Sequence, residues 1–168
     1  MSQQVSITIK EYDVTVRFEK ATYKMGRALE QPKAEKLVYN IQADKGSSDA
    51  TLLHDSYNRW LSEAIDTVRE YMVAEPVLAN KDETTFTILM PGNWEHYAPN
   101  APGLKYAMLE LIHNGMLSDW YDETKQDLAK EYKRNVQLNK AQIVSIIYSL
   151  KPPTVTITSE AGTFDGEA

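Results

Sequence analysis

The sequence predicts a mainly α protein: an elongated bundle of about four helices with a small inserted β-hairpin and an extended C-terminal tail. Three observations predict this fold. Apolar residues recur with a period near 3.6 over several long segments, which is typical of helices that bury one face. One segment in the middle of the chain has the composition and turn residues of two short strands. The pair Pro152-Pro153 then separates the last helical pattern from a short polar end.

The length and composition of the chain suit a single globular domain. It has 168 residues, of which 42% are hydrophobic and 25% are charged. A domain of this size buries most of the surface that its unfolded chain exposes. We expect residues 1–153 to form one helical domain and residues 154–168 to form an extended or disordered tail.

Charge, cysteine content and apolar runs argue against several classes of function. The formal net charge is −6 and the chain has no cysteine, so we expect no disulfide and no thiolate metal site. The densest basic cluster is only Lys130, Lys133 and Arg134, so we expect no specific nucleic-acid binding, although DNA can pass close to an acidic surface. Residues 1–4 lack the features of a signal peptide, and the longest apolar run, 143–150, is too short to span a membrane.

The N-terminal segment combines a strand-like and a helical pattern. Val5, Ile7 and Ile9 alternate, so the chain can open with a short extended stretch. Thr8 and Glu11 then have the spacing of a capping box, in which a hydroxyl and a carboxylate satisfy the first amides of a helix.

A first helix is expected over about residues 10–25. Apolar residues recur there at helical spacing: Val14, Phe18, Ala21, Met25 and Leu29. Val14, Val16 and Phe18 could equally line one face of a strand, which β-branched residues favour. The longer period favours the helix, and Gly26 is a natural end for it.

The second helix has the clearest pattern. It follows a connection over residues 30–46, with Ser47 or Ser48 as its cap and Pro76 at its end. It contains one continuous apolar stripe: Leu53, Tyr57, Trp60, Leu61, Ala64, Ile65, Val68, Tyr71 and Met72. A helix of about 25 residues spans ~37 Å, so we expect an elongated molecule.

Residues 77–90 have the pattern of a β-hairpin. Residues 77–78 and 84–90 flank a plausible turn at Asn80-Lys81-Asp82. An irregular loop follows from Pro91, and it contains Trp94 and Tyr97.

Two further helices are expected over about residues 102–121 and 124–150. The inward residues of the third helix are expected to be Leu104, Ala107, Met108, Leu111, Ile112 and Gly115. A glycine costs up to ~1 kcal/mol relative to alanine in a helix interior, so we expect Gly115 to permit close packing. The stripe of the fourth helix comprises Leu128, Tyr132, Val136, Ile143, Ile146, Ile147 and Leu150.

Three groups of polar residues are candidates for a catalytic or metal site, and the pattern of none of them predicts catalysis. Glu110 and His113 have the Glu-x-x-His spacing of a di-iron bundle, but no second such pair exists, so we expect a solvated pair and no metal. His54 and His96 lack a nucleophile on a strained turn. The acids of residues 119–123 fall at a helix end, where we expect Asp122 or Thr124 to act as an N-cap. We therefore expect no catalytic residue and no cofactor.

Tyrosine is the most suggestive feature of the surface. The chain has ten tyrosines, and this residue is enriched at interfaces because it buries area yet keeps a polar end. The candidate interface residues are Tyr97, Tyr106, Tyr121 and Tyr148, together with Val155 and Ile157 of the tail. The alternating segment 155–158 could pair with the sheet edge of another subunit, or with the hairpin of its own subunit.

The order of short motifs along the chain resembles one known family. The matching pieces are residues 22–26, Tyr39-x-Ile41-x-x-Asp44, the helix with Trp60, residues 90–94, Asp119-Trp120, Glu131-Tyr132 and Lys151-Pro152. Together they are similar to small proteins encoded beside capsid and tail genes in tailed bacteriophages and prophages of gut bacteria, crAss-like phages included. Two features depart from that pattern: residues 149–151 replace an arginine-rich run, and a tail follows the last proline.

The resemblance implies a structural virion protein of the neck, a ring subunit that connects head and tail. Its partners would be portal, neck or tail subunits and copies of itself, and it would be made in the host cytoplasm and reside in the virion. The main alternative is a cytoplasmic helical interaction or adaptor protein with no virion role. A third is a helical hydrolase that uses His54 or His96.

Overall fold

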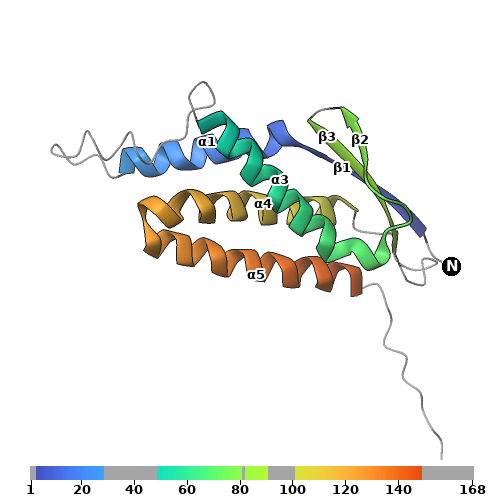
Figure 1. Ribbon diagram of the computed structural model, residues 1–168. Coiled ribbons are helices and arrows are strands. Elements are labelled where there is room, and N and C mark those ends of the chain that lie inside the picture. Colours follow the sequence, from blue (N-terminus) through green and yellow to red (C-terminus); the bar gives the residue numbers. More distant parts are fainter. Residues whose placement is uncertain (1–2, 29–48, 81, 91–100, 149–168) are drawn as a thin grey trace, which may run out of the picture.

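The computed structural model describes residues 3–28, 49–80, 82–90 and 101–148 (Figure 1). Within these ranges the chain forms four α-helices, one 3-10 turn and three β-strands, so the predicted mainly α fold is confirmed. The elements are β1 (Gln3–Lys10), α1 (Glu11–Ala28), α3 (Asp49–Val68), η1 (Arg69–Tyr71), β2 (Val77–Asn80), β3 (Glu83–Met90), α4 (Ala101–Thr124) and α5 (Gln126–Tyr148). Their buried apolar side chains form one continuous core.

α4 is the central helix of the bundle. It packs against α5, α3, α1 and β1, and Figure 1 shows it between α5 on one side and α1 and α3 on the other. Apolar residues are buried on more than one face of this helix, as is typical of a helix packed against several others: Leu104, Ala107, Met108, Leu109, Leu111, Ile112, Met116, Leu117 and Tyr121. The inward residues predicted for the third helix are therefore confirmed, but the second buried face was not predicted.

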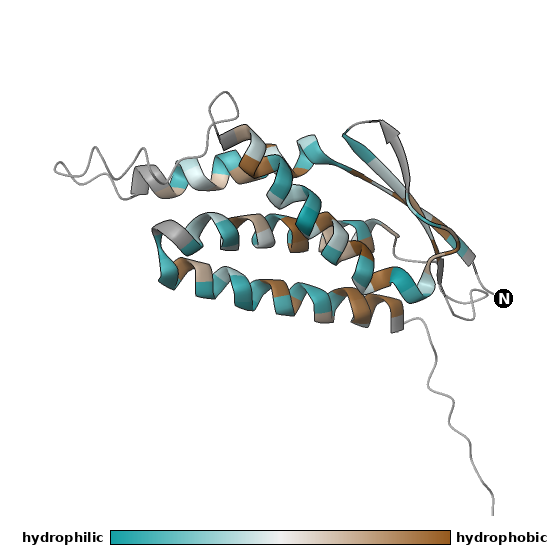
Figure 2. Ribbon diagram, in the orientation of Figure 1, coloured by the Kyte–Doolittle hydropathy of each residue, from teal (hydrophilic) through white to brown (hydrophobic). Residues whose placement is uncertain are grey.

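α5 returns alongside α4 after a tight connection at Lys125. The N–H of Lys125 donates to the carbonyl of Tyr121 at 2.7 Å, and the N–H of Ala129 donates to the carbonyl of Lys125 at 3.1 Å. Val136, Ile143 and Ile147 are buried against the core, as their spacing predicts. Figure 2 shows the most hydrophobic stretch of α5 towards its C-terminal end.

α3 ends at Val68, well before Pro76, which corrects the predicted boundary. The cause lies in the sheet. Met72 forms a β-bridge with Ile88, and the N–H of Val73 donates to the carbonyl of Thr87 at 2.9 Å. Backbone groups that pair with β3 cannot also continue a helix.

The three strands form an antiparallel sheet in the order β1-β3-β2. β2 and β3 confirm the predicted hairpin. β1 pairs with β3 along its whole length, from Gln3 opposite Met90 to Lys10 opposite Glu83. The predicted extended stretch at the N-terminus is thus the third strand of this sheet, and its side chains Val5, Ile7 and Ile9 are buried.

Two predictions at the ends of α1 are wrong. Thr8 is not a helix cap, because it lies inside β1 and its hydroxyl hydrogen-bonds the hydroxyl of Thr85 at 2.9 Å. The helix begins at Glu11, whose N–H donates to the carbonyl of Asp82 at 2.9 Å. Gly26 does not end the helix, which continues to Ala28. The strand alternative for residues 14–18 is also wrong, since these residues are helical.

Several predictions fall outside the described residues. They are the connection over 30–46, the caps Ser47 and Ser48, the loop with Trp94, His96 and Tyr97, and the tail 154–168.

Candidate functional site

The two predicted interface tyrosines whose side chains the structure describes differ in exposure. Tyr106 on α4 is 53% exposed, so it is available to a partner. Tyr121 is fully buried and belongs to the core, where burial raises the pKa of its hydroxyl and its ring stacks on that of Tyr132 at 5.7 Å between centroids. Tyr121 therefore cannot serve as a surface contact in this fold, because its position on the second buried face of α4 encloses it. Tyr97, Val155 and Ile157 lie outside the described residues, as does the side chain of Tyr148.

Arg17 connects α1 to α4 beside the exposed ring of Tyr106. Its guanidinium donates to Oε1 of Glu110 at 2.9 Å and lies 5.6 Å from the centre of the Tyr106 ring. The arrangement combines an ion pair with a cation–π contact, which orients the tyrosine on the surface. Glu110 is thus paired with an arginine, which corrects the expectation of a solvated Glu110–His113 pair.

His113 is half-buried, and its Nε2 has no hydrogen-bond partner in the described part of the chain. Burial lowers the pKa of its imidazole, while Glu110 and the backbone of Arg17 oppose that shift. The ring is therefore favoured in its neutral form. No group of three or more histidine or acidic side chains in the described residues is placed to hold a metal ion.

His54 lies on the surface of α3, next to the N-terminal end of α1. Its Nδ1 is 3.1 Å from Oε1 of Glu11, the first residue of α1. The pair joins the start of α1 to α3 and is half exposed on the histidine side. A hydrolytic site would also need a nucleophile beside the histidine. The side chain that His54 contacts here is the carboxylate of Glu11.

Asp119 is the acid of the 119–123 cluster with a specific structural role. Its Oδ2 accepts hydrogen bonds from the Ser56 hydroxyl at 2.7 Å and from the Trp60 indole at 2.8 Å. Its Oδ1 accepts a hydrogen bond from the guanidinium of Arg59. Three donors from α3 therefore converge on one carboxylate of α4, which fixes the crossing of these two helices.

Asp122 of the same cluster does not act as a cap. α4 continues to Thr124, so Asp122 lies inside the helix and pairs with Lys133 of α5 at 2.7 Å. The prediction that Asp122 or Thr124 is the N-cap of the last helix is wrong, because both residues belong to α4 and Lys125 is the residue that precedes α5.

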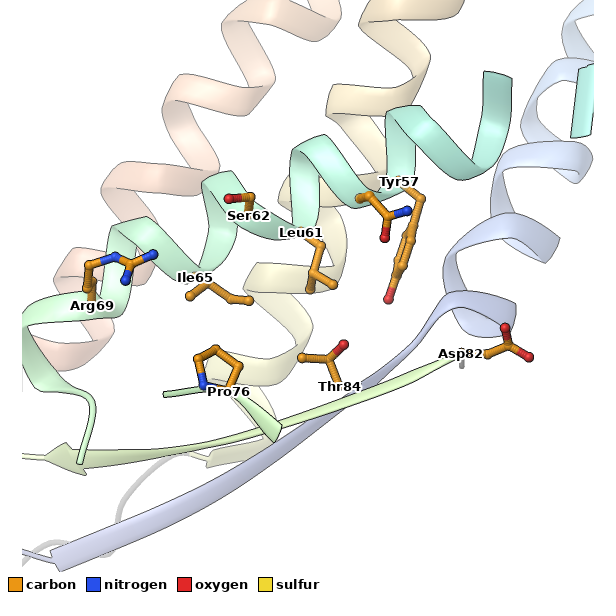
Figure 3. A pocket seen from close by; sticks show the side chains of 9 residues that line it. Tyr57, Leu61, Ser62, Ile65, Arg69, Pro76, Asp82 and Thr84 are labelled. Atoms are coloured by element: carbon orange, nitrogen blue, oxygen red, sulfur yellow. The ribbon is translucent and has the colours of Figure 1, made fainter. Parts of the chain in front are cut away.

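A groove lies between α3 and the sheet (Figure 3). Its volume is about 270 Å³. The side chains that line it come from α3, η1 and the hairpin: Tyr57, Asn58, Leu61, Ser62, Ile65, Arg69, Pro76, Asp82 and Thr84. Pro76 directly precedes β2 and Asp82 follows it, so the groove runs along the length of this strand.

Tyr57 contributes a phenol side chain to the lining of the groove. Its side chain is 3% exposed and points from α3 towards the sheet (Figure 3). Its hydroxyl has no hydrogen-bond partner among the described residues. Burial raises the pKa of this phenol, and the nearby carboxylates of Glu11 and Asp82 raise it further, so the hydroxyl keeps its proton and is a donor. A buried hydroxyl without a partner costs free energy, so this group lowers the stability of the fold as described.

In the sequence Tyr57 belongs to the apolar stripe of the second helix, and that pattern does not predict the groove. The available signal was that a tyrosine in an apolar stripe brings a polar end that needs a partner. The groove itself depends on the approach of the β2–β3 hairpin to α3, which no local pattern specifies.

None of the helices described by the structure is long and apolar enough to cross a membrane. Comparisons of the chain with protein-family models, with curated proteins and with solved structures found no match.

Proposed function

We propose that this chain is a non-enzymatic structural subunit of a tailed-phage particle, and that it forms part of a ring in the neck where the portal meets the tail. The observation behind the proposal is the resemblance that the ordered set of short motifs bears to neck and connector proteins of gut-bacterial phages. The positions of those motif residues in the fold give it support.

Three of the motif residues, Trp60, Asp119 and Trp120, lie where helices contact one another. Trp60 of α3 donates to Asp119 of α4 at 2.8 Å. Trp120 packs edge-on against Phe18 of α1, with ring centroids 5.9 Å apart. Residues with these contacts maintain a scaffold, so shared motifs at these positions are what a shared helical framework would require.

A scaffold of this kind acts through its surface, and tyrosines are prominent there. Tyr12 and Tyr23 on α1 and Tyr106 on α4 are each more than half exposed. Exposed tyrosines supply contact area at low entropic cost, which suits repeated contacts between neighbouring subunits. The basic cluster of α5 is partly neutralised, because Lys130 and Lys133 pair with Asp127 and Asp122. That arrangement suits a wall beside DNA better than a DNA-binding face.

Mass spectrometry of purified particles tests the proposal. Particles from the phage or prophage that encodes the chain should contain it at a ring-like ratio to the portal protein, and disruption of its gene should yield heads without attached tails. Host lysate protein of similar abundance is the control for carry-over. Particles that lack the chain and remain infectious would reject the proposal in favour of an adaptor protein of the host cytoplasm.

A further inference from the structure

The groove between α3 and the hairpin is flanked by β2, which is paired on one side only in the part of the chain that the structure describes. Within the described residues β2 pairs with β3 alone, and β3 lies between β2 and β1. The backbone groups on the outer side of β2 are therefore available to another extended segment. Because Pro76 and Asp82 stand at the two ends of β2, a segment added to this edge would run along the groove.

The size and lining of the groove favour a peptide over a small molecule. Its volume of about 270 Å³ is below the roughly 300–1,000 Å³ of typical small-molecule sites. Leu61, Ile65 and Pro76 give it apolar walls, which suit one or two aliphatic side chains. Alternate side chains of an added strand point to the same face, so they would enter the space between sheet and helix.

The chain itself contains a segment with these properties. α5 ends at Tyr148, and twenty residues follow it. Among them Val155-Thr156-Ile157-Thr158 alternates aliphatic and hydroxyl side chains, all with high strand propensity.

Charge is consistent with one direction of the added strand. Lys151 is the one cation of residues 149–168, and it precedes the aliphatic pair. Asp82 is exposed at the end of the groove next to the β2–β3 turn. A segment that runs antiparallel to β2 would begin at that end, which would bring Lys151 near Asp82.

We propose that the groove between α3 and β2 binds residues 154–158 of a neighbouring copy of this chain, which add a strand to the free edge of β2. This inference rests on the proposed function in one respect, the choice of a neighbouring copy as donor. A groove on one copy and a tail on the next form a heterologous interface, and such interfaces close into rings when repeated around an axis.

Two single variants of the full-length chain separate donor from acceptor. Ile157→Asp should disable the tail and leave the groove intact. Ser62→Trp should fill the groove from its exposed rim and leave the tail intact. Asp55→Trp, on an exposed position of α3 that does not line the groove, is the matched control.

The masses of these proteins, measured by light scattering after size exclusion, give the test. The wild type and Asp55→Trp should self-associate, and each disabling variant alone should be monomeric. A mixture of Ile157→Asp with Ser62→Trp should form a one-to-one heterodimer and nothing larger, because only one groove–tail contact can form. A monomeric wild type, or self-association that survives Ile157→Asp, would overturn the inference. Circular dichroism checks folding, and Asn58→Trp replaces Ser62→Trp if that variant unfolds.

The outcomes distinguish this inference from the proposed function. A chain that is present in particles but monomeric and insensitive to these variants would refute tail donation alone. A chain that self-associates as described but is missing from particles would refute the virion role alone.

Discussion

The indole ring of Trp60 lies directly against the backbone of α4 at Gly115. A Cβ added at Gly115 would lie 2.5 Å from both Cγ and Cε2 of that ring, closer than real Cβ atoms approach. The ring is held against α4 by its own N–H, which donates to Asp119, one turn beyond Gly115 on the same helix, at 2.8 Å. The close approach that the sequence predicted for Gly115 is confirmed, and Trp60 is the group that requires it.

Gly115→Ala should therefore destabilise the protein, even though alanine is the better helix former by about 1 kcal/mol. Overpacking against a fixed ring costs ~1–3 kcal/mol, so urea denaturation should show a lower midpoint. In a Trp60→Leu background the same substitution should become neutral or stabilising. A stabilised Gly115→Ala single variant would mean that the indole can move aside.

Leu61 of α3 and Leu111 of α4 are both buried in the core. Truncation of either to alanine leaves a cavity, so each should lower the free energy of unfolding by ~2–5 kcal/mol. Leu52→Ala is the control on α3, because Leu52 is 63% exposed and its truncation should change stability by no more than about 0.5 kcal/mol. Equal thermal midpoints for Leu61→Ala and Leu52→Ala would contradict the packing.

Asp119→Asn should loosen the crossing of α3 and α4. The amide keeps the shape but loses the charge that accepts from Arg59, Ser56 and Trp60, and hydrogen bonds to charged groups are worth about 1.5–3 kcal/mol. The control is Asp122→Asn, where an exposed ion pair with Lys133 should contribute at most about 1 kcal/mol. Chemical denaturation of both variants measures the difference, and equal losses would argue against a special role for Asp119.

His113 should make stability depend on pH. Burial lowers the pKa of His113 below its usual value of 6.5, so the unfolded chain takes up a proton that the folded chain resists. Below pH 6.5 the unfolded state binds more protons, and stability should fall as the pH drops from 6.5 towards the folded pKa. In His113→Gln this part of the pH dependence should vanish when urea midpoints are compared across that range. A variant that keeps the full wild-type dependence would assign it to other groups.

Binding of DNA or metal is expected to be weak. Lys130 and Lys133 are paired with acids, so a titration with duplex DNA at physiological salt should show no tight complex. Elemental analysis of protein purified without chelator should show no stoichiometric iron or zinc. Tight duplex binding, or one bound metal ion per chain, would contradict this prediction.

The sequence by itself determined the elements whose patterns are local. The helical spacing of apolar residues predicted α3, α4 and α5, and the turn residues at 80–82 predicted the hairpin. Gly115 in a helix interior predicted a close contact between helices. These predictions succeeded because a helix or hairpin that buries one face leaves its period in the chain.

Only the tertiary structure decided how distant segments meet. The same residues 3–10 that offered a strand and a helix cap became an edge strand, because β3 supplied partners about eighty residues away. Likewise, Tyr121 is in the core because it lies on a second buried face of α4, and Tyr57 lines a groove that forms only where the hairpin approaches α3. Burial and hydrogen bonding between segments far apart in sequence set these outcomes, and a local pattern contains no record of which segment will approach.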